Sequence, residues 1–147
     1  MIKIYKPVHY DFGNFHQYRI INTSKFTLCI NKIISADNIS TLPHDHACDF
    51  LSIVLWGGYT EKVYKNYLEN PSDVEYRSFK KFSIHKFFHN WAHIIVKSSI
   101  VYTLFITWNN QGRKPYIYTP EGPVTFDQYF SRKLFLKYGK QDPVEEF

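Results

Sequence analysis

One stretch of the sequence decides the fold prediction: His44-Asp-His46-Ala-Cys-Asp49-Phe50-Leu-Ser-Ile-Val-Leu-Trp-Gly57-Gly58-Tyr59-Thr-Glu61. Its apolar run over residues 50–55 is typical of a buried strand, and the Gly57-Gly58 pair that ends it is typical of a tight turn. From Tyr59 the residues alternate, so that Tyr59 and Glu61 share one face of an extended chain. The stretch therefore predicts two strands joined by a turn.

Similar short runs of β-branched and aromatic residues recur along the chain. They predict further strands over residues 26–34, 74–79, 82–84, 91–96 and 100–108. Strands of this length and spacing are typical of an all-β sandwich or barrel. One helix is predicted near the C-terminus, capped by Thr125 or Asp127 and ended by Gly139, with an apolar stripe made of Phe126, Phe130, Leu134 and Tyr138.

The length of the chain favours one domain. Within it we expect three parts. We expect residues 1–25 to form an edge strand or an arm that crosses to a second subunit. Residues 26–124 are expected to form the barrel, and residues 125–147 the helix and a tail.

Composition excludes several classes of protein. Hydrophobic residues make up 44% of the 147 residues and charged residues 21%, which excludes wholesale disorder. No apolar run approaches the length of a membrane span, and two cysteines are too few for a disulfide framework. The first residues lack the apolar region of a secretory signal. We therefore expect a cytoplasmic protein that does not contact a membrane.

The net charge of +5 raises the possibility of a nucleic-acid partner. Lysines supply 14 of the 18 basic residues and are scattered along the chain. Arginine, which makes most bidentate contacts with phosphates and bases, occurs four times. The charge pattern therefore argues against nucleic-acid binding.

Two histidines, His44 and His46, precede the strand at residues 50–55. In an extended chain, residues two apart point to the same face, about 6.6 to 6.8 Å from each other. Two such imidazoles converge readily on one divalent ion, and a third ligand is then needed from elsewhere in the fold. His93, in a strand-like context 47 residues after His46, is the best candidate. The alternative for His93 is a hydrogen-bonded histidine of the core.

A rival arrangement uses His85, His89 and His93, which are spaced four residues apart and would align on a helix. The segment has no capping residue, is rich in aromatic side chains and leads directly into Ile94-Ile95-Val96. We therefore expect His85 and His89 to lie in a loop or on the surface.

The stretch from His44 to Glu61 resembles the first conserved motif of the cupin superfamily. It is most similar to small cupin-domain proteins with a His-Asp-His-x-x-Asp-Phe-x-Ser signature, and His93 resembles the histidine of the second cupin motif. The resemblance covers about residues 26–130. It implies a double-stranded β-helix barrel of the jelly-roll type, commonly a homodimer. It also implies a divalent metal ion (iron, manganese, nickel or zinc) inside the barrel.

Carried over to matching positions, the resemblance makes His44, His46 and His93 the metal ligands. The carboxylate of the usual motif departs from the pattern, because Phe50 and Leu51 stand where a glutamate is expected. Asp49 comes one position early, and strand alternation turns it away from the histidines. A β-bulge would make Asp49 a ligand. Otherwise it would orient a histidine ring, cap a turn or be solvated.

Other polar residues are candidates for chemistry. Glu61 or Tyr59 is expected to move protons, since both share a face after the glycine turn. Ser52 and Cys48 have the same parity as the two histidines and are expected to face inward.

The resulting hypothesis is a metal-dependent enzyme of dioxygenase or isomerase type that acts on a small molecule. The alternatives are a non-catalytic module that binds a small ligand in the same barrel, and a metal-free sugar epimerase or isomerase with histidine as its base.

Overall fold

A computed structural model describes residues 1–11, 15–34 and 42–129 of the chain. Its elements are β1 (Ile4–Tyr5), β2 (Val8–Asp11), β3 (Phe15–Thr23), β4 (Thr27–Ile33), β5 (His44–Asp45), β6 (Asp49–Trp56), β7 (Tyr59–Tyr64), β8 (Val74–Phe79), β9 (Ile84–Phe87), β10 (Ala92–Ser98), β11 (Val101–Trp108), β12 (Tyr116–Thr119), β13 (Gly122–Thr125) and α1 (Phe126–Tyr129). The all-β prediction is confirmed. Among the described residues, no helix is long and apolar enough to cross a membrane.

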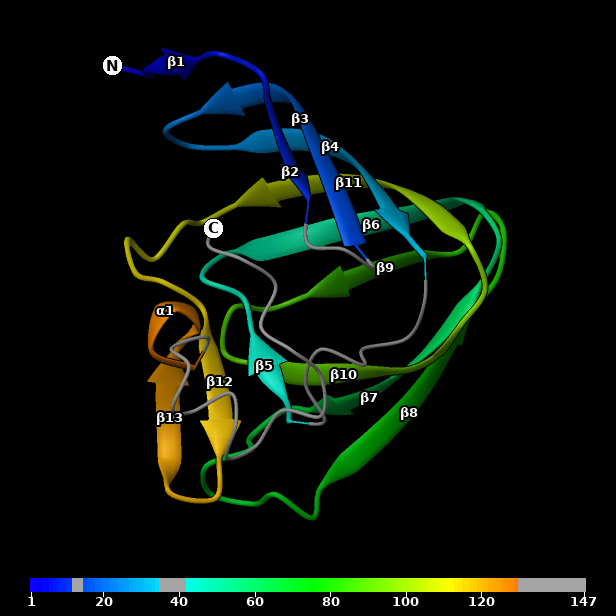
Figure 1. The fold of residues 1–147 in the computed structure, drawn as a ribbon, viewed down its shortest axis with the longest axis vertical. Helices are drawn as coiled ribbons and strands as arrows, with labels where there is room; N and C mark the ends of the chain where they lie inside the picture. Colours follow the sequence, from blue (N-terminus) through cyan, green and yellow to red (C-terminus); the bar gives the residue numbers. More distant parts are fainter. Residues whose placement is uncertain (12–14, 35–41, 130–147) are drawn as a thin grey trace.

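The strands form two facing antiparallel sheets (Figure 1). The first has seven strands in the order β1-β3-β4-β11-β6-β9, with β2 also paired to β3. The second has six strands in the order β13-β12-β5-β10-β7-β8. Because consecutive strands β6 and β7, and β9 and β10, lie in different sheets, the chain crosses repeatedly between the layers. This arrangement is the jelly-roll barrel that the sequence predicted.

The predicted strands match β4, β6, β7, β8, β10 and β11 closely, and one prediction is displaced. Residues 82–84 were expected to form a strand, but Phe82 has a φ of 67° and lies in a turn. Its amide donates to the carbonyl of Val54, and the Ser83 amide donates to the carbonyl of Lys80. The strand, β9, therefore begins at Ile84.

The predictions for the two ends of the chain can be compared with the structure only in part. Strands β1 and β2 pair with β3 at one edge of the first sheet, and the division of the chain into an arm, a barrel and a tail stays a prediction. The predicted C-terminal helix is seen as the short segment α1. The remainder of that prediction, from Phe130 to Gly139, lies outside the described residues.

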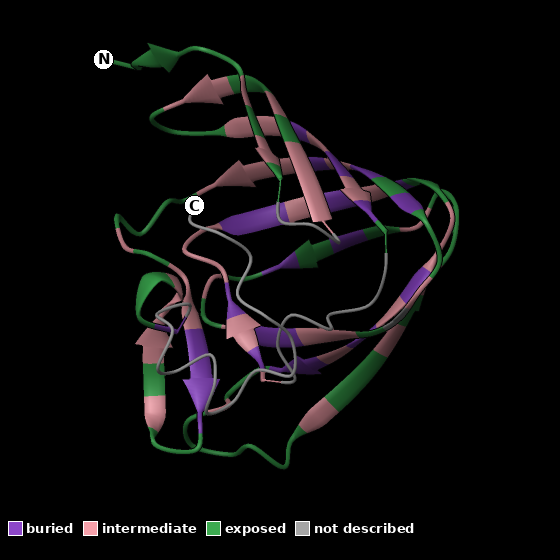
Figure 2. Ribbon diagram, in the orientation of Figure 1, coloured by how far each residue is buried: buried purple, intermediate pink, exposed green. Residues whose placement is uncertain are grey.

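The space between the sheets is layered. Two apolar clusters fill it: a first cluster of Cys29, Phe50, Val63, Phe87 and Phe105, and a second cluster of Ile33, Val54, Tyr59 and Val101. Buried polar side chains also face this interior, and we call them the polar layer: Asn31, Ser52, Glu61, His85, His93 and Thr103. Figure 2 shows the buried stretches on the inner strands of both sheets.

Gly57 makes the turn between β6 and β7 possible. Its φ of +76° lies in the left-handed region, and a Cβ built there would stand 2.1 Å from the carbonyl oxygen of Ile100. We expect Gly57→Ala to lower the free energy of unfolding by about 2 kcal/mol or more, since strain and clash add. Chemical denaturation measures the loss. Gly112→Ala is the control, because it shares a positive φ but meets nothing within 4 Å. Equal losses in both variants would show that the clash has no effect.

Candidate metal centre

Sheet pairing explains why His44 and His93 meet. Strand β5 pairs antiparallel with β10, and this register places His44 directly opposite His93. His46 follows two residues after His44, so its side chain returns to the same face. Three histidines that lie up to 49 positions apart in the sequence therefore converge on one place between the sheets.

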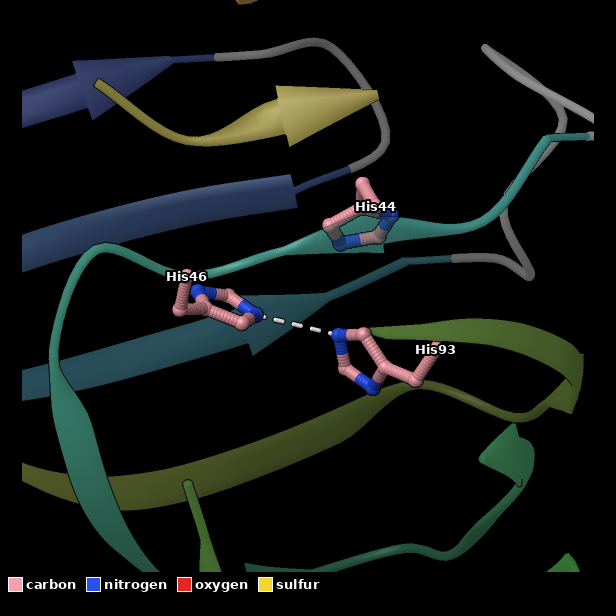
Figure 3. Close-up of side chains that lie close together, drawn as sticks. All are labelled: His44, His46 and His93. Atoms are coloured by element: carbon pink, nitrogen blue, oxygen red, sulfur yellow. Dashed lines mark hydrogen bonds between the residues drawn. The ribbon is translucent and has the colours of Figure 1, made fainter. Parts of the chain in front are cut away.

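The three rings face one another closely. Ligand nitrogens of His44, His46 and His93 all lie within 4.8 Å of one another. His46 Nε2 and His93 Nε2 are 3.0 Å apart, the contact drawn as a dashed line in Figure 3. The ring centroids are 4.7 Å apart for His44 and His93 and 5.5 Å apart for His44 and His46. The predicted histidine set is thus brought together.

This spacing fits a divalent metal ion. Two imidazole nitrogens that are each about 2.05 Å from one ion lie about 2.9 Å apart at a 90° bond angle and about 3.3 Å apart at the tetrahedral angle. The 3.0 Å separation of His46 and His93 falls within that range. Three protein ligands of this kind leave coordination positions open for water or a substrate.

The environment favours the neutral form of His44 and His46, which is the form that binds metal. Burial lowers the pKa of His44 and of His46 well below the usual value, and the neighbouring histidine rings lower both further. A cluster of uncharged, desolvated imidazoles offers lone pairs to a cation without first losing protons.

Glu61 holds His93 in place. Its carboxylate is fully buried, and Oε2 lies 2.7 Å from His93 Nδ1. Burial alone would raise the pKa of Glu61, but the His93 hydrogen bond and nearby imidazoles outweigh it, so the pKa lies below its usual value. The ionised carboxylate accepts the Nδ1 proton of His93, which leaves the Nε2 lone pair directed at the other histidines. Glu61 was predicted to move protons. The structure places its carboxylate beside Nδ1 of His93, the ring nitrogen that does not contact His46.

Asp49 does not join the histidines. Its Oδ1 accepts hydrogen bonds from the backbone amide and the Nδ1 of His89, each 2.8 Å away, and its Oδ2 accepts one from Asn109 Nδ2 at 2.9 Å. The group that converges contains His44, His46 and His93 without it. Strand β6 starts regularly at Asp49, with no bulge to re-aim the side chain. Two of the roles that the sequence left open fit these contacts. Asp49 orients the ring of His89, and it caps turns through the His89 amide and Asn109.

We expect Asp49→Ala to lower the free energy of unfolding by about 2 to 4 kcal/mol, because three hydrogen bonds to a largely buried carboxylate are lost. Metal affinity is expected to stay within about twofold of the unaltered protein, since no converging nitrogen changes. Thermal unfolding and cobalt(II) titration measure the two quantities. Asp73→Ala, in an exposed turn, is the control. Loss of metal at unchanged stability would restore Asp49 as a ligand.

The rival helical histidine set is wrong. His85 lies in strand β9 and His93 in strand β10, so the three residues do not share a helix face. The expectation that His85 lies in a loop or on the surface is also wrong, because it is 8% exposed and faces the interior. Its parity with Phe87 is the signal that would have placed it there. His89 lies in the turn after β9 and is half-buried.

Tyr59 lies in the same interior but away from the three converging rings. Its hydroxyl is 3.0 Å from His85 Nε2, and the side chain is 7% exposed. Burial and the negative charge of Glu61 raise the pKa of Tyr59 well above its usual value. Ser52 faces inward as predicted and is hydrogen-bonded to Tyr59. Cys48 is half-buried, burial raises the pKa of its thiol to about 11, and it is not a member of the converging group.

The hydrogen bonds of Asp45, on the other face of β5, were not predicted from the sequence. Asp45 is 1% exposed and accepts hydrogen bonds from Arg113 Nη1 and Nη2, the Tyr116 amide and the Tyr118 hydroxyl. These contacts fix β5 through Asp45, the residue between His44 and His46. The available signal was alternation: a carboxylate between two inward histidines must face the opposite way and needs a cation there.

Comparison with known proteins agrees with this fold. No protein-family model matches the chain, and no curated protein matches its sequence. Its structure is similar to that of HEPD from Streptomyces albus with 2-hydroxyethylphosphonate and Fe(II) bound (TM-score 0.57, 6% identity, 79% of this chain and 26% of that one). It is also similar to hydroxypropylphosphonic acid epoxidase from S. wedmorenis (TM-score 0.54, 10% identity, 71% and 56%). A third similar structure is KdgF from Halomonas sp. (TM-score 0.50, 13% identity, 70% and 87%).

The fold is the two-sheet jelly roll that the resemblance to cupins implied, and these solved structures share it. The chain spans about a quarter of the length of the first of these proteins and just over half of the second. At identities this low the likeness concerns the fold. The geometry of this chain's own histidines supports a site for a divalent metal ion.

Proposed function

We propose that the protein is a metal-dependent cupin enzyme that acts on a small molecule. The observation that carries this proposal is the convergence of three imidazoles, one of them oriented by a buried carboxylate. A single catalytic base needs neither the second and third rings nor a separation that suits one ion. The arrangement therefore favours metal chemistry over the metal-free epimerase.

The parts of the site divide by role. His44, His46 and His93 would hold the ion, and Glu61 would hold the proton of the neutral His93 ring on Nδ1, so that Nε2 is the metal-binding nitrogen. A bound divalent ion supplies Lewis-acid chemistry, or oxygen activation if it is iron. Fe(II) is present in the similar HEPD structure, so iron is the first metal to test. The phosphonate bound there makes small organic anions the first substrate class to screen.

The test is metal analysis of the purified protein, followed by anaerobic loading with Fe(II), Mn(II), Ni(II) and Zn(II). One tightly bound ion per chain is expected. Oxygen consumption by the iron form in the presence of a substrate then favours a dioxygenase, while turnover without oxygen favours an isomerase. Ligand binding without turnover would favour the non-catalytic module. Metal binding by the unaltered protein that is no tighter than binding by the His44→Ala variant would contradict the proposal.

We also propose the homodimer that the resemblance implied. Aliphatic side chains that are not fully buried lie together on the outer face of four adjacent strands of the first sheet: Leu28, Ile30, Leu51, Ile53, Ile84, Leu104 and Ile106. A continuous apolar sheet face of this kind is typical of an interface, and a second copy presents the same flat patch.

Light scattering after size-exclusion chromatography is expected to give the mass of a dimer. Ile106→Lys, at the centre of this face, is expected to give a monomer, because a charge would be buried unpaired between the copies. Thr60→Lys, on the other sheet, is the control. A monomeric unaltered protein, or a dimeric Ile106→Lys variant, would contradict this interface.

A further inference from the structure

The polar layer interrupts an otherwise apolar interior in a regular way. On β6, Ser52 stands between Phe50 of the first cluster and Val54 of the second. Asn31 on β4, Glu61 on β7 and Thr103 on β11 repeat this pattern, each two residues from a member of either cluster. Since residues two apart share a face, the strands place these polar side chains at the same depth, between two apolar walls.

Three side-chain atoms of this layer have no hydrogen-bond partner among the described residues: Oδ1 of Asn31, Oε1 of Glu61 and Nδ1 of His85. The last two belong to residues of facing strands, and Glu61 is fully buried. Leaving a buried polar atom unpaired costs about 1 to 3 kcal/mol, and more if it is charged. Folded proteins usually satisfy such atoms with ordered water.

The hydrogen-bond roles of His85 follow from its neighbour. Burial lowers the pKa of His85 to about 4, so the ring is neutral at pH 7 and carries one proton. The Tyr59 hydroxyl lies 3.0 Å from His85 Nε2 and keeps its proton, because burial raises the pKa of Tyr59 well above its usual value; we assign that proton to the hydrogen bond with Nε2. The single proton of His85 therefore lies on Nδ1, which makes that unpaired atom a donor.

Glu61 supplies the complementary atom. Its Oε2 accepts the Nδ1 proton of His93, and its Oε1 is an acceptor with no donor. Tyr59 and Glu61 share one face of β7, about 6.6 to 6.8 Å apart along the strand. Because the Tyr59 hydroxyl reaches His85, the carboxylate and the imidazole face the same space, and the two interact electrostatically.

We propose that a buried water molecule bridges Nδ1 of His85 and Oε1 of Glu61, and that His85 and Tyr59 are thereby positioning residues for the metal ligand His93. The water accepts from His85 and donates to Glu61. It completes a chain from Ser52 through Tyr59, His85, water and Glu61 to His93. The effect on metal binding rests on the proposed function; the water and the proton positions do not.

Through this series of hydrogen bonds, Tyr59 and His85 affect how firmly the metal ligand His93 is held. With both carboxylate oxygens bonded, Glu61 has one favoured orientation, and its Oε2 stays on His93 Nδ1. Loss of the bridge frees the carboxylate to turn. His93 is then held less firmly with its Nε2 toward His44 and His46.

The first test observes the bridge directly in the unaltered protein. A high-resolution crystal structure is expected to show a water within hydrogen-bond distance of both Glu61 Oε1 and His85 Nδ1. Nitrogen-15 NMR is expected to place the protons of His85 and His93 on Nδ1 in both rings. A site without water, or a His85 proton on Nε2, would overturn the proposal.

The second test uses two substitutions of His85. Each one places an amide group where one of the two ring nitrogens stood. His85→Asn keeps a donor near Nδ1, whereas His85→Gln keeps a partner for Tyr59 and removes that donor. Cobalt(II) affinity is expected to stay within about twofold in His85→Asn and to fall about fivefold or more in His85→Gln, toward the loss typical of outer contacts. Unfolding curves of both variants show whether folding is equally affected.

The outcomes separate the two proposals. Equal affinities in His85→Asn and His85→Gln at similar stability would overturn the positioning role. If the unaltered protein binds no cobalt(II), the metal proposal fails, and the crystal structure and NMR still decide whether the water bridge exists. Tyr59→Phe provides a further check, because removing the donor to Nε2 is expected to let the His85 proton redistribute between its two nitrogens.

Discussion

Replacing His93 with alanine is expected to lower cobalt(II) affinity by more than about 100-fold, beyond the range seen when only outer contacts are lost. The substitution removes one of three converging nitrogens and leaves the buried carboxylate of Glu61 without its partner. Titration followed by the visible absorption of cobalt(II) measures the affinity, and elemental analysis measures the metal retained on purification.

His44→Ala separates metal binding from folding in the same experiment. His44 is a member of the converging set but has no buried carboxylate bonded to it, so its loss is expected to harm stability less. His9→Ala is the control, because His9 lies on the exposed strand β2, outside the set. Near-normal metal binding in His93→Ala and His44→Ala would remove the basis for a metal-dependent function.

Glu61→Gln is expected to produce the second large effect, with opposite consequences for metal binding and folding. The amide keeps the shape and an oxygen that accepts from His93 Nδ1, but loses the negative charge that raises the basicity of the ring. Cobalt(II) affinity is expected to fall by about 10- to 100-fold. The free energy of unfolding of the metal-free protein is expected to stay within about 1 kcal/mol or to rise, because a buried charge has been removed.

Glu75→Gln is the matched control on the neighbouring strand β8, where the carboxylate is exposed and pairs with Lys65 and Arg77. It is expected to change neither quantity appreciably. If Glu61→Gln bound cobalt(II) as tightly as the unaltered protein, the carboxylate would have no part in holding His93 ready for metal.

Local pattern was enough to predict most strands and the histidine set. Alternation and turn residues defined β6 and β7, and the parity of His44 and His46 put their rings on one face. The choice of His93 over His85 and His89 depended on its strand-like context and on the resemblance to cupins. The structure agrees, because β10 runs antiparallel to β5 and places His93 opposite His44.

The roles of the acidic residues were not accessible in the same way. Asp49 and Glu61 were both candidates from their places in the sequence, yet Asp49 bonds to His89 and Asn109 while Glu61 bonds to His93. Asn109 is 60 residues from Asp49 in the sequence, and no local rule predicts that contact. The error for His85 has a different origin, because its parity with the buried Phe87 was a local signal for an inward side chain.

Sequence by itself determined the strand faces, the turn at Gly57 and the inward direction of two histidines, since these follow from a period of two and from backbone sterics. Tertiary structure alone decided which carboxylate meets which imidazole and which polar atoms remain unpaired inside. Glu61 and His93 are 32 positions apart and Asp49 and His89 are 40 positions apart, and these partners are selected by strand order and sheet spacing. Neither of these is encoded in any short stretch of the chain.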